Sequence, residues 1–431
     1  GIYARINDHN GIYKSIELAK GKTPIATFTD VDYRAPDPDI SWANQKMLES
    51  LPGTAMAFGY QSYRVKPGES FAYPEAIIGV HTGDWHKAME EYASWAHEVW
   101  DWQPYPSTIT DAYVMKFGPG NTAEPLIVNG KWRDPKTTLT EQADILELQQ
   151  WWGWSEVGPW GVPLDDDLKI AREQLGDTYV DRVSYTFVPD PITKRMSYKN
   201  NRGEYEYNEA WGGAEALRTF IDGLKQEGGV VTLYTDPLLV SGATKFGKAY
   251  GYELGVMNPF WDKKKMEGAF YTPLNPEGYI SMYGSWNMCL DNPFYQDFFA
   301  ETMKRVVRDL GVGIRLDEMG ISRSTCYSDK HEHVFAKEPG DEVLFQAEGE
   351  LFRKVRQAMD EVDPTLILMT EAPGNDFLAR YLDGSLFYDT RKYSLLKDFN
   401  PVALNLFRFY FPECKVVDYF QAGVVFCKTF F

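Results

Sequence analysis

Three charged residues at the ends of two apolar segments are the best candidates for chemistry in this sequence. Residues 312–316 run into Asp317, and residues 366–370 run into Glu371. Side chains alternate along a strand, so Arg315 shares a face with Asp317, where its guanidinium would hold that carboxylate ionised. An ionised carboxylate is suited to attack an anomeric carbon, and Glu371 can protonate a leaving oxygen if its surroundings favour the neutral acid. Taken alone, a buried Arg–Asp pair beside a helix-capping Glu explains these motifs equally well, but two carboxylates on successive strand ends favour catalysis.

Other acidic residues offer different assignments. Asp317 is followed by Glu318, which strand alternation turns to the opposite face unless the strand has already ended. Asp236 follows another buried strand candidate, where it can bind substrate hydroxyls or begin the turn before the next proline. Asp389 ends a later strand candidate. We therefore take Glu318, Asp236 and Asp389, together with Arg315, as candidate substrate-binding residues.

Aromatic and histidine side chains supply further candidates. A Trp-rich segment lies where a second strand is expected to end, and Trp154 and Trp160 are candidates to stack on a sugar face. His331 and His333 follow the Asp317 strand. Two histidines at this spacing are more typical of a solvated loop than of a metal site, although His333 is kept as a candidate substrate contact. The four cysteines lack CxxC spacing, which predicts neither a zinc ribbon nor a disulfide framework.

The order of predicted elements places these residues in one fold class. After residue 105 the sequence alternates strand-like and helical segments, which is typical of a parallel sheet. The pattern predicts an α/β fold, a (β/α)8 TIM barrel, whose active site lies at the carboxyl ends of the strands. A doubly wound open sheet is the alternative, but no Gly-rich phosphate turn follows the first strand. The strand candidates are 113–117, 151–160, 183–188, 230–235, 312–316, 366–370, 386–388, 406–411 and 424–430, and the helix candidates are 138–150, 168–175, 214–226, 294–310 and 342–361.

The first part of the chain has a different pattern. Short strand-like segments are interrupted by turns, and a helix with aromatic residues at helical spacing follows over residues 84–100. We therefore predict two domains. A β-rich, β-sandwich-like N-terminal domain spans 1–105 and ends in a Trp-rich helix and linker, and a catalytic barrel spans 106–431.

Composition narrows the classes of partner. The formal net charge of −18 repels phosphate backbones, so no nucleic acid partner is expected. The sequence has no apolar run long enough to cross a bilayer, so no membrane partner is expected either. Aromatic residues make up 15% of the chain. Because their flat apolar faces suit sugar rings as well as cores, this enrichment favours carbohydrate as a partner.

The motifs around the two carboxylates resemble those of known barrel hydrolases. Residues 313–317 resemble the Gly-x-Arg-x-Asp strand of the α-amylase superfamily, which implies Asp317 as nucleophile and Glu371 as acid/base. That superfamily's Asn-His-Asp motif has no counterpart here. The consecutive acids Asp317 and Glu318 also resemble the strand end of hexosaminidases that use the substrate's own acetamido group. In that case Asp317 would steer the acetamide and Glu318 would protonate the leaving group.

Two resemblances extend beyond the carboxylates. An upstream β domain that leads by a Trp-rich helix into a barrel is similar to the α-galactosidase-like hydrolases, which implies Asp389 as an alternative acid/base. Segments 79–86, 232–237 and 408–413 are similar to a bacterial family of glycoside hydrolases of unassigned specificity. That last resemblance covers most of the chain, but it brings no substrate with it.

Together these resemblances imply a retaining glycoside hydrolase that acts on an oligosaccharide or glycoside substrate without a cofactor or a metal. A covalent glycosyl–enzyme intermediate would form on Asp317, with Glu371 as acid/base. Such a mechanism predicts carboxyl groups about 5–5.5 Å apart, against roughly 6.5–9.5 Å for inversion. The alternatives are the substrate-assisted hexosaminidase and a catalytically inert barrel that binds carbohydrate. A phosphate-binding metabolic barrel is disfavoured because no Gly-rich loop lies near the last strands.

Both ends of the chain are expected to expose apolar surface. The last strand candidate would be the eighth strand of the barrel, and no helix pattern follows it. The first residues look like the remainder of a β-sandwich. We therefore expect a fragment of a longer protein, with uncovered side chains around Ile2, Tyr3, Phe430 and Phe431, and with low stability or self-association.

Overall fold

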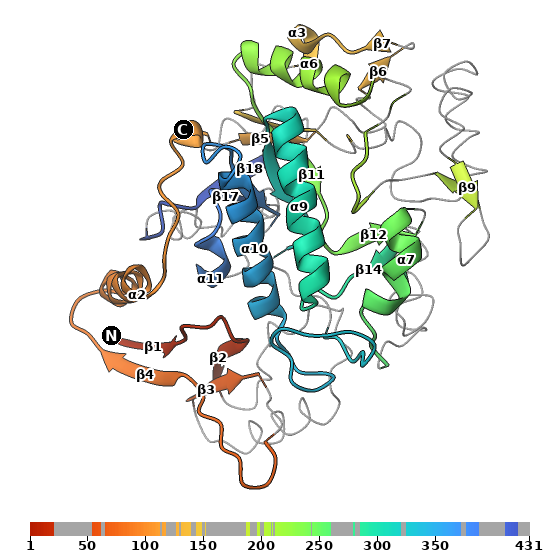
Figure 1. Cartoon of the computed structure of the whole chain (residues 1–431). Coiled ribbons are helices and arrows are strands. Elements are labelled where there is room, and N and C mark those ends of the chain that lie inside the picture. The colour runs from red at the N-terminus through yellow and green to blue at the C-terminus, as the bar shows by residue number, and fades with distance from the viewer. Residues whose placement is uncertain are drawn as a thin grey trace.

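The computed structural model (Figure 1) places a closed barrel of parallel strands at the centre of the molecule. The strands of the barrel are β5 (Val114–Phe117), β8 (Ile145–Leu148), β11 (Val230–Thr235), β15 (Gly313–Leu316), β16 (Leu368–Thr370), β17 (Gly384–Phe387) and β18 (Lys415–Phe420). Each strand pairs in parallel with the next along the chain, and β18 pairs with β5 to close the ring. The α/β barrel that the alternating pattern predicts is therefore present. The structure describes residues 1–20, 54–61, 65–112, 114–117, 126–128, 131–138, 144–148, 151, 187–189, 196–198, 202–207, 209, 212–242, 244–259, 279–280, 285–319, 325–371, 376–387 and 410–420.

Helices pack around the barrel and beside the small sheets outside it. They are α2 (His86–Val99), α3 (Pro135–Thr138), α6 (Gly213–Gln226), α7 (Lys245–Leu254), α9 (Pro293–Leu310), α10 (Leu344–Asp360) and α11 (Asp376–Ala379), with a short 3-10 helix, η1 (Ser107–Ile109). Figure 1 shows α9 and α10 side by side in front of the strands, where they contact each other. Among the described residues, no helix is long and apolar enough to cross a bilayer.

Helix α9 shows how the sequence builds this layer. The Asn292 side chain accepts a hydrogen bond from Tyr295 N at 2.8 Å and Pro293 occupies the first turn, so both are typical helix-start residues. Gly311 ends the helix with a left-handed φ of 60°. The apolar face of α9 belongs to the same buried cluster as Ile314 and Leu316. These two side chains of β15 therefore point to the helices, which leaves the alternate positions to face the inside of the barrel.

Several small antiparallel sheets lie outside the barrel. They are β1 (Ile2–Asn7) with β4 (Glu75–Val80), β2 (Lys14–Lys20) with β3 (Thr54–Tyr60), β6 (Ile127–Val128) with β7 (Lys131–Trp132), β9 (Phe187–Pro189) with β10 (Met196–Tyr198), and β14 (Ser285–Asn287) between β12 (Leu239–Ser241) and β13 (Tyr279–Ile280). Helix α2 joins the first of these to the barrel: Ala96 and Trp100 lie in the main core cluster together with Phe411. The division of the chain at residue 105 stays a prediction.

The structure differs from the predicted elements at three places. Ile145–Leu148 forms β8, where a helix over 138–150 was predicted, because pairing between β5 and β11 places the segment inside the sheet and buries all four of its residues. Of the strand predicted at 183–188, the described residues Phe187 and Val188 belong to β9, which pairs with β10 outside the barrel. The last described barrel strand, β18, was not among the predicted strands, and residues 406–409 of the predicted strand 406–411 lie outside the described residues. The predicted strands 151–160 and 424–430 lie outside the described residues, apart from Trp151. The ring closes with seven described strands instead of the predicted eight.

Candidate active site

Three carboxylates form a row at the carboxyl ends of neighbouring strands. In the sheet register the last residues of β11, β15 and β16 are partners. The residues that follow them are Asp236, Asp317 and Glu371. The backbone ladder continues to this point, because Asp317 N donates to Thr235 O at 2.6 Å and Glu371 N donates to Leu316 O at 3.1 Å. The row lies at the end of the barrel where active sites are found in this architecture.

Asp317 is held by two donors from inside the barrel. Arg315 Nη1 donates to Asp317 Oδ1 at 2.5 Å, and the Tyr234 hydroxyl donates to Asp317 Oδ2 at 2.6 Å. The Arg315 guanidinium also lies over the Tyr234 ring, 5.1 Å from its centroid. Burial raises the pKa of the Tyr234 hydroxyl, and the charge of Asp317 adds to this effect, so Tyr234 remains a donor. The ion pair that strand alternation predicts is present.

The same guanidinium binds a second carboxylate, which sequence reasoning missed. Arg315 Nη2 donates to Glu147 Oε1 at 3.0 Å, and Arg315 Nε donates to Glu147 Oε2. Both residues are almost completely buried, with side-chain exposures of 1% and 0%. Glu147 was overlooked because its segment was predicted to be helical. As a strand, the segment places Glu147 opposite Thr232 of β11, on the face that looks into the barrel.

Glu318 and Glu371 meet at the end of β15. Glu318 N donates to Glu371 Oε2 at 2.6 Å. Glu318 has a φ of 61°, in the left-handed region that glycine favours, and the strand has ended at Leu316. Strand alternation therefore does not set the direction of its side chain. Glu318 is 8% exposed, and its charge acts on Asp236. The structure thus brings Glu318 to the same end of the barrel as Asp317 and Glu371.

Asp236 is buried, and its side chain stabilises the turn that follows β11. Its Oδ1 accepts hydrogen bonds from Leu238 N at 3.0 Å and Leu239 N at 3.2 Å, and its Oδ2 lies 3.7 Å from Arg202 Nη1. The carboxylate therefore begins the turn after β11, as one of the two sequence interpretations predicts. Burial raises the pKa of Asp236, and the negative charge of Glu318 raises it further. With 1% of its surface exposed, Asp236 is placed to support the site rather than to line it.

Carboxylates outnumber guanidinium groups in this buried cluster. Taking out of water more carboxylates than guanidinium groups favours the protonated form of at least one carboxyl group. Asp317 is the member of the cluster that accepts hydrogen bonds from both Arg315 and Tyr234. The arrangement can supply two carboxyl groups, those of Asp317 and Glu371, for acid and base chemistry at one place. The carboxylates are Glu147, Asp236, Asp317, Glu318 and Glu371, and the guanidinium groups are those of Arg202 and Arg315.

Three of the candidate substrate-binding residues, Trp154, Trp160 and Asp389, lie outside the described residues. Trp151, in the same Trp-rich segment as Trp154 and Trp160, is 4% exposed and donates its indole N–H to Tyr234 O at 2.7 Å. This ring supports the strand that carries Tyr234. It belongs to the core cluster, as expected of most rings in the Trp-rich segment.

His333 lies in a group of side chains that the sequence interpretation did not bring together. Ligand atoms of Cys289, Cys326, His331 and His333 all lie within 4.8 Å of one another. Cys289 and the two imidazoles lower the pKa of the Cys326 thiol, the Cys289 contact being the largest cause. The two histidines are thus half-buried beside two cysteines, which the interpretation as a solvated loop did not anticipate. The spacing Cys326-x4-His331-x-His333 was the available signal, but Cys289 is remote in sequence.

Comparison with solved structures finds distant glycoside hydrolases. A noncanonic maltogenic α-amylase, AmyB of Thermotoga neapolitana, is 13% identical, with 66% of this chain and 52% of that chain covered and a TM-score of 0.36. The GH36 α-galactosidase AgaB of Geobacillus stearothermophilus is 11% identical, with 77% and 36% covered and a TM-score of 0.42. The α-N-acetylgalactosaminidase NagBb of Bifidobacterium bifidum is 10% identical, with 80% and 49% covered and a TM-score of 0.44. The chain thus spans between about a third and a half of the length of these proteins.

No curated protein matches the chain. One family model, Domain of unknown function (DUF6259), matches residues 194–415. The matched segment contains Arg315, Asp317 and Glu371, as well as the group of cysteines and histidines around His333. Because the match spans just over half of the 431 residues, the chain belongs to the DUF6259 family.

Proposed function

We propose that this protein is a retaining glycoside hydrolase that cleaves an O-glycosidic bond in an oligosaccharide or glycoside. Asp317 is the nucleophile and Glu371 is the acid/base. The observation that carries the proposal is the pairing of Asp317 with both Arg315 and Tyr234, next to Glu371 at the carboxyl end of a parallel barrel. An ionised carboxylate beside a second carboxyl group is the arrangement that this reaction requires.

The reaction follows in two steps. First, an Asp317 carboxylate oxygen attacks the anomeric carbon, the glycosidic C–O bond breaks, and Glu371 gives its proton to the leaving oxygen. Second, Glu371 takes a proton from water, whose oxygen attacks the same carbon and releases Asp317. Arg315 and Tyr234 stabilise the Asp317 carboxylate as it leaves, so their hydrogen bonds assist the second step. Glu371 can keep its bond from Glu318 N in both protonation states, because a carboxylic acid retains a carbonyl acceptor.

The strand register supports the spacing that retention needs. Asp317 and Glu371 follow partner residues on paired strands, and paired strands lie about 4.8 Å apart. Carboxyl groups carried from equivalent positions can therefore approach the roughly 5–5.5 Å of a retaining pair without a change in the backbone. We propose this separation for Asp317 and Glu371.

The test begins with a panel of aryl glycosides of the common sugars in both anomers. On any substrate that the wild type cleaves, Asp317→Gly should lose about 10³-fold or more of kcat, because no nucleophile remains. Added azide, a small external nucleophile, should restore turnover and give a glycosyl azide of inverted configuration. Rescue of this kind by azide would assign the nucleophile to Asp317 directly.

The matched control is Asp383→Asn. Asp383 also pairs with an arginine, since Arg356 Nη1 donates to its Oδ2 at 2.9 Å, but it precedes β17 at the amino end of the barrel. This variant should lose stability and keep kcat, because residues at that end support the fold. Normal activity in a folded Asp317→Asn variant would transfer the role of nucleophile away from Asp317 and refute the proposal.

A second candidate function has one observation in its favour. The left-handed turn at Glu318 brings this carboxylate to the site, as a substrate-assisted hexosaminidase would need. In that mechanism Asp317 steers the acetamido group and Glu318 protonates the leaving group. Activity confined to N-acetylhexosaminides, inhibition by a thiazoline analogue of the cyclised intermediate, and no azide rescue of Asp317→Gly would favour this candidate over the first.

A further inference from the structure

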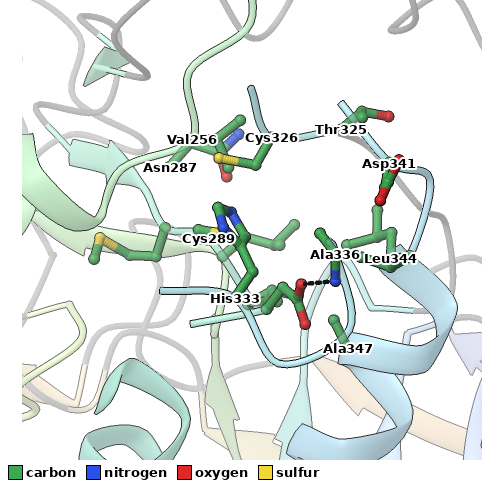
Figure 2. Close-up of a pocket in the computed structure, with 15 residues that line it drawn as sticks. Val256, Asn287, Cys289, Thr325, Cys326, His333, Ala336, Asp341, Leu344 and Ala347 are labelled. Atoms are coloured by element: carbon green, nitrogen blue, oxygen red, sulfur yellow. Dashed lines mark hydrogen bonds between the residues drawn. The ribbon is translucent and has the colours of Figure 1, made fainter. Parts of the chain in front are cut away.

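A group of sulfur and nitrogen atoms gathers at a small pocket lined by residues of the loops after β11, β14 and β15 (Figure 2). Its members are Cys289, which follows β14, and Cys326, His331 and His333, from the loop between β15 and α10. Figure 2 shows Cys289, Cys326 and His333 pointing toward one another at this pocket. Cys289 and Cys326 are buried, with exposures of 2% and 8%, and both are free thiols.

The distances between these atoms fit one tetrahedral ion. All four ligand atoms lie within 4.8 Å of one another, and Cys326 Sγ lies 3.6 Å from His331 Nε2. Zinc binds thiolates at about 2.3 Å and imidazoles at about 2.0–2.1 Å, so the edges of its tetrahedron measure roughly 3.3–3.8 Å. Bringing the four atoms to these separations needs only small rotations of side chains.

Hydrogen bonds from neighbouring groups orient the candidate ligands, as such bonds do in metal sites. His331 Nδ1 lies 2.6 Å from the carbonyl oxygen of Glu253, which places the ring proton there and turns Nε2 toward Cys326. Ser328 N donates to Cys326 Sγ at 3.5 Å. His333 Nε2 is buried and has no hydrogen-bond partner among the described residues. A buried nitrogen of this kind is costly unless a ligand occupies it.

The backbone around the group is fixed by its own hydrogen bonds. Asp291 accepts from Phe335 N at 3.0 Å and from Ala336 N at 2.9 Å, and Asn292 Nδ2 donates to Glu332 O at 3.0 Å. These bonds tie the histidine loop to the segment that carries Cys289. The ligands are therefore held together by the fold and do not depend on a chance contact of exposed side chains.

We propose that Cys289, Cys326, His331 and His333 bind one structural zinc ion. Two sulfur and two nitrogen ligands in a tetrahedron are the set that zinc prefers, and four protein ligands leave no open position for chemistry. Binding releases the proton of each cysteine that is still a thiol, and the two thiolates then neutralise the charge of the ion. The ion would fasten the loop after β15, the strand that leads into Asp317, to the segment after β14.

The first experiment uses the whole protein, purified under reducing conditions without chelators. We expect about one zinc per chain by elemental analysis. After removal of zinc and addition of cobalt(II) alone, we expect the intense visible bands of tetrahedral cobalt together with a near-ultraviolet sulfur-to-cobalt charge-transfer band. Zinc removal should also lower the melting temperature, and zinc addition should restore it.

Variants then assign the ligands. Cys326→Ser and His331→Gln should each reduce zinc to less than about a fifth of the wild-type content. A tetrahedral site loses most of its affinity for zinc when one of its four ligands is removed. Cys414→Ser is the matched control for a buried free thiol, and His86→Gln is the control for a histidine. Both controls should keep the full zinc content.

Three results would overturn the proposal. They are wild-type protein without zinc that gives no charge-transfer band with cobalt, a Cys289–Cys326 disulfide in protein handled without oxidant, and full zinc content in a folded Cys326→Ser variant. If Cys326→Ser does not fold, the cobalt spectrum of the wild type decides, because a sulfur-to-cobalt band requires a thiolate ligand.

Discussion

At the scale of single residues, the position of Asp317 is set by contacts from two strands. Arg315 reaches it from two positions earlier on β15, and Tyr234 reaches it from β11. Arg315 is itself shared with Glu147. Hydrogen bonds to an ionised group contribute about 1.5–3 kcal/mol each. Loss of the donor group of Arg315 or of Tyr234 should therefore lower the reactivity of Asp317 without abolishing it.

Tyr234→Phe tests this contact. The change removes only the hydroxyl that donates to Asp317 Oδ2, so kcat should fall roughly 10- to 100-fold while the fold persists. Tyr295→Phe is the control, because its buried hydroxyl donates to Pro237 O in the same region but does not touch Asp317. Steady-state kinetics on the best aryl glycoside gives the comparison. Equal losses in the two variants would mean that the Tyr234 hydroxyl acts only through packing.

Asp236 gives a prediction about pH. Burial raises its pKa, and the charge of Glu318 adds to the shift. Above the ordinary Asp value of about 3.9, the folded protein therefore keeps a proton that the unfolded chain has lost. Since the folded state then binds more protons, this residue's contribution to stability falls as pH rises through the window up to its raised pKa.

Asp236→Asn should remove that contribution and can keep the Oδ1 bonds to Leu238 N and Leu239 N. Relative to the variant, the wild type should be most stable near the ordinary Asp value of about 3.9 and lose this advantage as the pH rises toward the raised pKa of Asp236. Urea unfolding of both proteins across this range measures the difference. A difference that does not change with pH would show that Asp236 titrates alike in the folded and unfolded states.

Single residues also show what the sequence can and cannot predict. The Arg315–Asp317 pair follows from alternation along one strand, which is a local rule. Glu147 depends on identifying a strand in a segment that also fits helical spacing, so its role was hidden. The partnership of Cys289 with His331 and His333 joins residues on separate loops, and no spacing in one sequence encodes such a contact.

At the scale of elements, the end of β15 is the decisive feature. The strand stops at Leu316, and Glu318 then adopts a left-handed φ of 61°. This turn gives Glu371 a backbone donor and brings the Glu318 carboxylate to the site. A residue with a Cβ pays roughly 1–2 kcal/mol for this conformation. The strain is therefore associated with the arrangement of the candidate catalytic groups.

Two substitutions separate the backbone strain from the side chain. Glu318→Gly and Glu318→Ala both remove the carboxylate, but only glycine adopts a positive φ without strain. The glycine variant should therefore be more stable than the alanine variant by about 1 kcal/mol in denaturant unfolding. If the alanine variant is equally stable, the turn at Glu318 has relaxed and is not held by its surroundings. Both variants should keep azide-independent turnover if Glu371, rather than Glu318, is the acid/base.

Elements differ in how far they could be predicted. The helices α6, α9 and α10 and the strands β11, β15 and β16 lie within a few residues of their predicted bounds, because each has a clear period or a strong end signal. Strand β18 was not among the predicted strands. Its pairing with β17 and β5 places it in the barrel, and such pairing can join segments that are distant in the sequence.

At the scale of the whole molecule, the ring and its layers gather the site from distant parts of the chain. The described strands close the barrel by pairing β18 with β5, so the ends of all of them meet at one mouth. The molecule also carries a formal charge of −18. Mutual repulsion between copies therefore opposes association at low salt.

The sheet of β1 and β4, in contrast, favours association between copies of the protein. Ile2 and Val80 are register partners, and Ile2, Ile78 and Val80 are 70%, 62% and 81% exposed. Within the described part of the chain, this sheet has two strands only. Exposed apolar side chains on a short sheet with open edges favour pairing between copies. Net repulsion and local apolar contact are thus in competition, and salt decides between them.

Sedimentation velocity tests the balance. The weight-average sedimentation coefficient should rise with protein concentration, and it should rise more steeply at about 0.5 M salt than at low salt, since salt screens the charge but not the apolar contact. Ile78→Lys should weaken association at both salt levels. Val65→Lys, which changes an exposed apolar side chain outside this sheet, should leave it unchanged. A sedimentation coefficient that is independent of concentration and salt would show that the exposed face of β1 and β4 is too small to overcome the repulsion.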